Sequence, residues 1–147
     1  MDIIFEFVIM AISVVSFAYA YNIPPRSLLA VGLTGGVSWI IYSLLRSIDK
    51  EYLGVFLASL TIGTMAIFFS KKHKLPSTVY IIPSIIPLVP GMSLYFTMYN
   101  IVMENYNEAF LRGIYAIATA GLLACGIIVS MGIKSNVDLI LNRFRKN

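Results

Sequence analysis

The sequence predicts an all-α protein that crosses a lipid bilayer about five times. Of its 147 residues, 59% are hydrophobic and only 12% are charged, and the mean hydropathy is +0.84. Soluble domains are about half apolar and about one quarter charged, so this chain has too few polar side chains to cover a surface in water. Apolar stretches recur along the chain, separated by short polar breaks. Lipid is therefore the expected surrounding solvent.

Each apolar stretch is long enough to form a transmembrane helix, because a hydrocarbon core of about 30 Å needs about 20 apolar residues. The predicted spans are residues 3–21, 28–45, 52–70, 78–103 and 109–133. We expect them to form one integral membrane domain, 1–147, with a cytoplasmic tail at 134–147.

The first stretch also has features of a secretion signal. It ends in Ala18-Tyr19-Ala20, which resembles a signal-peptidase site, but Met1-Asp2 lacks the positive charges of a signal peptide. We expect this helix to be retained. The segment 22–26 that follows contains two consecutive prolines and predicts a turn at the membrane surface.

The distribution of Lys and Arg predicts the orientation. With five crossings, one side of the membrane has Arg26, Lys71, Lys72, Lys74, Lys134, Arg143, Arg145 and Lys146. The opposite side has only Arg46, Lys50 and Arg112. Because cytoplasmic loops carry the excess of positive charge, the N-terminus is predicted outside and the C-terminus in the cytoplasm.

The tail allows two interpretations. Asn136 could cap a short helix in which Val137, Ile140, Leu141 and Phe144 recur at helical spacing, so that the tail lies on the inner membrane surface. A frayed tail is the alternative.

Small residues recur at four-residue spacing, which lets helix backbones approach closely. The predicted helix-packing positions are Gly32, Gly36, Gly63 and Gly121. Cys125 is the one cysteine and is expected to pack within a span.

The fourth span is predicted to be broken or kinked by Pro83, Pro87, Pro90 and Gly91. Each proline lacks an N–H and clashes with the carbonyl four residues earlier, so the carbonyls of residues 79, 83 and 86 should lose their helical partners. Such groups are tolerated within a membrane only where protein or a water-filled cavity satisfies them. Transporters use unwound backbone of this kind to bind solutes.

A helix that restarts near Gly91 would present the free N–H groups of Met92, Ser93 and Leu94 to a substrate carboxylate. The candidate residues of a substrate path are Pro83, Ser84, Pro87, Pro90, Gly91, Ser93, Thr97 and Asn100. The alternative is a kink that only shapes helix packing.

Enzyme chemistry and nucleic-acid binding are not predicted. No metal-ligand cluster, phosphate-binding loop or intramembrane aspartate pair is present in the sequence, and no cofactor is expected. His73 lies in a basic segment that predicts a solvated loop, so no catalytic residue is assigned. Glu6 lies about one turn into the first span, where a carboxylate at the headgroups is the simpler interpretation.

The sequence resembles the integral membrane domain of threonine/serine exporters over nearly its whole length. The resemblance rests on the order and spacing of residues 22–26 (NIPPR), Gly32, Gly35 and Gly36, residues 56–64 (FLASLTIGT) and residues 82–91 (IPSIIPLVPG). It implies export of a small polar metabolite, an amino acid such as threonine or serine or, in relatives, a dicarboxylate, across a prokaryotic plasma membrane.

The resemblance also implies a partner. Family members combine two membrane halves, so a second five-span subunit with a hydrolase-like cytoplasmic extension is expected, or else a homo-oligomer. Two other functions remain open: a scaffold that stabilises a partner without transport, and a homo-oligomeric multidrug-type exporter that uses Glu6.

Overall fold

The computed structural model describes the backbone of residues 3–144 and the side chains of residues 3–133. This part of the chain consists of helices and short connections, without a strand. The elements are α1 (Ile3–Ala20), α2 (Pro25–Arg46), α3 (Glu51–His73), α4 (Thr78–Ile85), the 3-10 helix η1 (Ile86–Leu88), α5 (Gly91–Val102) and α6 (Tyr106–Phe144).

The predicted all-α membrane fold is confirmed. In the described part of the chain, four helices are long and apolar enough to span a membrane: Ile3–Ala20, Pro25–Arg46, Glu51–His73 and Tyr106–Ile133. A fifth crossing is formed if Thr78–Leu88 and Gly91–Val102, which meet at a bend of 50°, are one broken span.

Two helix ends differ from the sequence prediction. The sequence predicts a turn over residues 22–26, but α2 already begins at Pro25. A proline is tolerated at the first helical position, because the N–H that it lacks would have no helical partner there. At the other end, α3 continues through His73 and stops at Lys74, which has a left-handed φ of 54°. The segment around His73 is thus helix and not loop.

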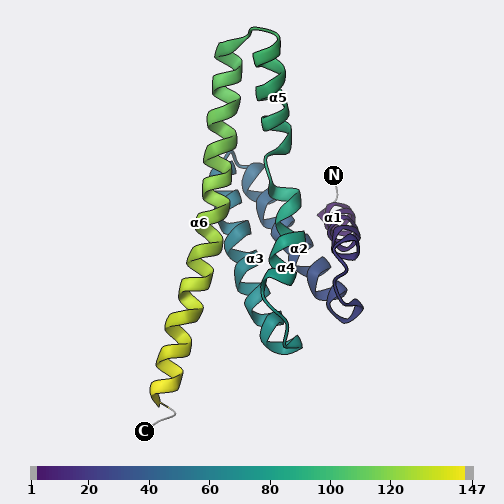
Figure 1. The fold of residues 1–147 in the computed structure, drawn as a ribbon, viewed down its shortest axis with the longest axis vertical. Helices are drawn as coiled ribbons and strands as arrows, with labels where there is room; N and C mark the ends of the chain where they lie inside the picture. The colour runs from purple at the N-terminus through teal and green to yellow at the C-terminus, as the bar shows by residue number, and fades with distance from the viewer. Residues whose placement is uncertain (1–2, 145–147) are drawn as a thin grey trace.

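The helices fall into two groups along the long axis of the molecule (Figure 1). Helices α1 to α4 lie together, and α6 runs alongside α3. Helix α5 and the first half of α6 extend beyond the other helices. Helix α5, of which every residue is described, packs mainly against α6 and contains no buried residue.

Small residues bring the packed helices close together. A Cβ at Gly36 would lie 2.6 Å from the Phe7 ring of α1, and one at Gly32 would lie 2.9 Å from Val15. Between α3 and α6, a Cβ at Gly63 would overlap Ser130. Gly121 differs, because a Cβ there would meet no atom of the described residues within 4 Å. Gly121 therefore makes no close contact with another helix among residues 3–133.

The predicted tail helix is not separate from the last span. Helix α6 runs from Tyr106 to Phe144 without a break at Asn136, so a helix start at that residue is wrong. The directions of the tail side chains, on which the prediction of a membrane-surface face depends, lie outside the described residues.

Candidate functional site

The break between α4 and α5 begins later than the first proline suggested. Pro83 lies inside α4, so the helix continues through it. The helix changes to a 3-10 turn at Ile86 and then to extended backbone at Val89, with φ −64° and ψ 132°. Val89 precedes Pro90, and the helical region is sterically disfavoured for a residue before proline. Pro90 therefore favours the extended backbone at Val89.

The backbone groups at the break are partly satisfied. The Leu94 N–H is predicted to be free, but it donates to the Pro90 carbonyl at 3.1 Å. The Val89 N–H donates to the Ile86 carbonyl at 3.3 Å. The N–H groups of Met92 and Ser93 have no acceptor among the described residues. Two donors at the start of α5 thus remain available.

A cavity of about 290 Å³ lies against the break. Residues from α2, α3, α6 and the break itself line it: Trp39, Tyr42, Arg46, Glu51, Pro87, Leu88, Val89, Pro90, Gly91, Met92, Ser93, Tyr115 and Thr119. The cavity therefore joins the unwound backbone to side chains that are far away in the sequence.

Glu51 accepts hydrogen bonds from two tyrosines that line this cavity with it. The hydroxyls of Tyr42 and Tyr115 each donate to its Oε1 at 2.7 Å. The Arg46 Nε lies 3.8 Å from the same oxygen. These contacts join α2, α3 and α6, and they place one cation and one carboxylate in the lining of the cavity.

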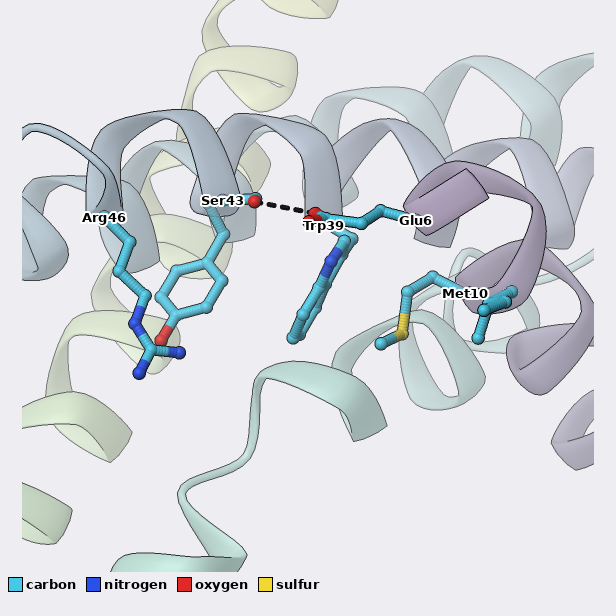
Figure 2. Close-up of a pocket in the computed structure, with 7 residues that line it drawn as sticks. Glu6, Met10, Trp39, Ser43 and Arg46 are labelled. Atoms are coloured by element: carbon cyan, nitrogen blue, oxygen red, sulfur yellow. Dashed lines mark hydrogen bonds between the residues drawn. The ribbon is translucent and has the colours of Figure 1, made fainter. Parts of the chain in front are cut away.

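Trp39 separates this cavity from a second, smaller one. Its ring packs 5.4 Å from that of Tyr42, and its Nε1 is buried without a hydrogen-bond partner among the described residues. The second cavity, of about 180 Å³, contains Glu6, whose Oε2 accepts a hydrogen bond of 2.7 Å from the Ser43 hydroxyl. Figure 2 shows Trp39 between Glu6 and Arg46, with the break passing beneath. The two cavities share a wall of Trp39, Tyr42 and Arg46.

The predicted path residues divide between two places. Four of them line the larger cavity: Pro87, Pro90, Gly91 and Ser93. The others do not. Pro83 and Ser84 are buried within α4, where the Ser84 hydroxyl lies 3.5 Å from the Val31 carbonyl of α2. Thr97 and Asn100 bond to carbonyls of their own helix.

Sequence reasoning missed the side chains that face the break from other helices. These side chains are Trp39, Tyr42, Arg46, Glu51 and Tyr115. Tyr42, Arg46 and Glu51 lie near helix ends, where aromatic and charged residues ordinarily anchor a helix at the interface, whereas Trp39 and Tyr115 lie further inside α2 and α6. One signal was available: Tyr42 and Arg46 are four residues apart and so share a helix face. Arg46 is also the last residue of α2, and only a short turn separates it from Glu51 at the start of α3.

At the opposite end of α3, His73 is not part of a solvated loop. Its Nδ1 lies 2.8 Å from the hydroxyl of Tyr80, a fully buried residue of α4. The Tyr80 hydroxyl also donates to the Ser27 hydroxyl of α2 at 3.2 Å. These contacts link α2, α3 and α4 at the end of α3 opposite Glu51.

Tyr80→Phe is expected to lower the free energy of unfolding by about 1 kcal/mol, because it removes the hydroxyl that links α2, α3 and α4. Tyr19→Phe is the matched control, since Tyr19 is 76% exposed. Thermal unfolding of the purified variants measures the difference. Equal melting temperatures for both variants would show that the Tyr80 hydroxyl contributes nothing to stability.

The chain is similar to known proteins over most of its length. No solved structure matches the chain. An uncharacterized protein of Haemophilus influenzae is 22% identical in an alignment of 142 positions that covers 84% of this chain and 48% of that relative. The chain thus spans about half the length of this curated relative. Residues 6–133 match the family model described as "Threonine/Serine exporter, ThrE". This multi-pass membrane protein therefore belongs to the threonine/serine exporter family of transporters.

Proposed function

We propose that this chain is one subunit of a secondary exporter and that the larger cavity lies on its substrate path. The solute is a small metabolite that carries a carboxylate, either an amino acid such as threonine or serine or a dicarboxylate. The observation that carries the proposal is the unwound segment between η1 and α5, which lies against a cavity within a chain of an exporter family.

The donors around the cavity suit a carboxylate. The free N–H groups of Met92 and Ser93 lie at the positive end of α5, where a helix terminus attracts an anion. The buried Nε1 of Trp39 has no acceptor in the described part of the chain, and Arg46 adds a guanidinium. A guanidinium can bind a carboxylate with two parallel hydrogen bonds.

The proposed orientation of the substrate path in the membrane rests on the distribution of Lys and Arg. With the N-terminus outside, as the Lys and Arg count predicts, Arg46 and Glu51 lie toward the outside of the cell. The contact between His73 and Tyr80 then lies toward the cytoplasm. The substrate would enter when this inner contact opens and leave through the outer cavity, in alternating access.

The proposed partner is a second membrane subunit of the same family, with five spans and a hydrolase-like cytoplasmic extension, or else a second copy of this chain. Two observations support a partner. Helix α5 is only 12 residues long and contains no buried residue, although its side chains are largely apolar. The curated relative is about twice as long as the aligned region. The partner would cover α5 within the membrane.

Efflux of labelled threonine, serine and succinate tests the proposal, in cells that express this chain with and without a candidate partner. We expect partner-dependent efflux of at least one solute, and the pattern of solutes identifies the substrate class. A stable complex without efflux of any of the three would favour the scaffold function.

The same assay addresses the role of Glu6. Loss of efflux in Glu6→Gln when this chain is expressed alone would favour the homo-oligomeric multidrug-type exporter. Unchanged efflux in this variant would exclude that mechanism.

A further inference from the structure

The contacts of Glu51 leave half of its carboxylate unused. Both tyrosine hydroxyls and the Arg46 Nε meet Oε1. The second oxygen, Oε2, has no partner among the described residues. Glu51 lines the larger cavity and its side chain is 30% exposed. An acceptor with full negative charge is therefore available to a ligand.

Arg46 is similarly available. Its only described ion pair is the 3.8 Å contact through Nε, and its side chain is 62% exposed. Glu51 Oε1 accepts hydrogen bonds from the two tyrosines and lies 3.8 Å from the Arg46 Nε, which is too far for a hydrogen bond. Glu51 therefore does not form a bidentate pair with the guanidinium. Figure 2 shows the Arg46 guanidinium directed away from α2, on the same side as Trp39. A second carboxylate could thus bind Arg46 without displacing Glu51.

The lining of the cavity carries charges of both signs. Its lining has one cation, Arg46, and one carboxylate, Glu51, and its other ionisable groups are the phenols of Tyr42 and Tyr115. An amino acid zwitterion has the complementary pair of charges. A dicarboxylate bound to Arg46 would bring its second carboxylate toward Glu51, and like charges in a partly enclosed site repel each other strongly.

We propose that Glu51 determines the charge of the solute that this site accepts. Its Oε2 binds the ammonium group of a zwitterion, while the Arg46 guanidinium binds the carboxylate. The inference rests on the proposed function, because it treats the larger cavity as the substrate site. It adds a specificity residue and a reason for excluding dicarboxylates.

The sequence provides a direct probe of binding. Trp39 is the one tryptophan of the chain and lines the cavity, so intrinsic tryptophan fluorescence of the purified full chain reports on this site. Serine and succinate are the two ligands to titrate. We expect the wild-type protein to bind serine more tightly than succinate.

Glu51→Gln should invert this preference. Glutamine keeps an oxygen that accepts from both tyrosines, so the fold should persist, but the charge is lost. We expect serine to bind about tenfold more weakly, since a hydrogen bond to a charged group is removed, and succinate to bind more tightly. Arg46→Gln should weaken both ligands. Glu108→Gln, at an exposed glutamate near the start of α6, is the control and should change neither.

Several outcomes would overturn the inference. One is that wild-type protein prefers succinate. Another is that Glu51→Gln weakens both ligands equally, which would give Glu51 a structural role only. A third is that efflux occurs although neither solute changes Trp39 fluorescence, which would place the substrate site elsewhere and leave the exporter function intact. Binding with the expected selectivity but without efflux would support the inference and contradict the exporter function.

Discussion

Replacing Gly126 with leucine is expected to disrupt the packing of α6 against α3 and to lower the melting temperature sharply. A Cβ at Gly126 would overlap the Ser59 hydroxyl and would lie 2.8 Å from the Phe56 carbonyl oxygen and 3.0 Å from the Leu60 nitrogen. Backbone atoms cannot move aside as a flexible side chain can, so the helices must separate. Overpacking of this kind costs about 1–3 kcal/mol, and more where backbone is displaced.

Gly121→Leu provides the matched control for this prediction. Gly121 lies on the same helix, five residues earlier, and a Cβ there would meet no described atom within 4 Å. Thermal unfolding of the two purified variants in one detergent should give a normal transition for Gly121→Leu and a destabilised one for Gly126→Leu. Equal melting temperatures would contradict the close α3–α6 contact.

This pair of glycines also shows what the sequence could not predict about packing. Four-residue spacing identifies residues that share a helix face, but it does not say which face meets a neighbour. Gly63 meets Ser130, and Gly126 meets Ser59, so the α3–α6 contact is made by a glycine and a serine from each helix. Gly121 has the same spacing pattern and no neighbour in the described chain.

The break in the fourth span was predictable because proline acts on its own backbone. The exact position was not. Pro83 sits within α4 even though it lacks a donor, whereas Val89, the residue before Pro90, has the extended backbone that a following proline favours. Three prolines in one apolar run predict a break, but tertiary packing decides which of them the helix tolerates. Here Pro83 is buried, and the break falls beside the cavity.

The cavity's polar residues were beyond sequence reasoning because they come together only in the folded chain. Glu51 and Tyr115 are 64 residues apart and still form a hydrogen bond of 2.7 Å. Glu51 taken alone looks like an interfacial anchor. Only the turn between α2 and α3, together with the packing of α6 on α3, brings them opposite the start of α5. The sequence therefore predicts the unwound backbone, but not the polar side chains of α2, α3 and α6 that line the cavity with it.

Gly91→Leu is expected to block transport without unfolding the protein. Gly91 lines the larger cavity, and a Cβ there would meet no described atom within 4 Å, so a side chain fits the backbone and projects into open space. The leucine would compete with the solute for the same volume. With about 1–3 kcal/mol of overpacking against a bound solute, substrate affinity should fall by about ten- to a hundredfold.

The control for this variant is Gly132→Leu, because Gly132 is exposed on α6 and a Cβ there also meets no described atom within 4 Å. Efflux of the transported solute and the melting temperature should be measured for both variants. We expect both to melt like the wild-type protein, with efflux lost only in Gly91→Leu. Since both positions accept a side chain without a clash, a selective loss of efflux would arise from the cavity itself. Normal efflux in a folded Gly91→Leu variant would show that the solute does not pass beside the start of α5.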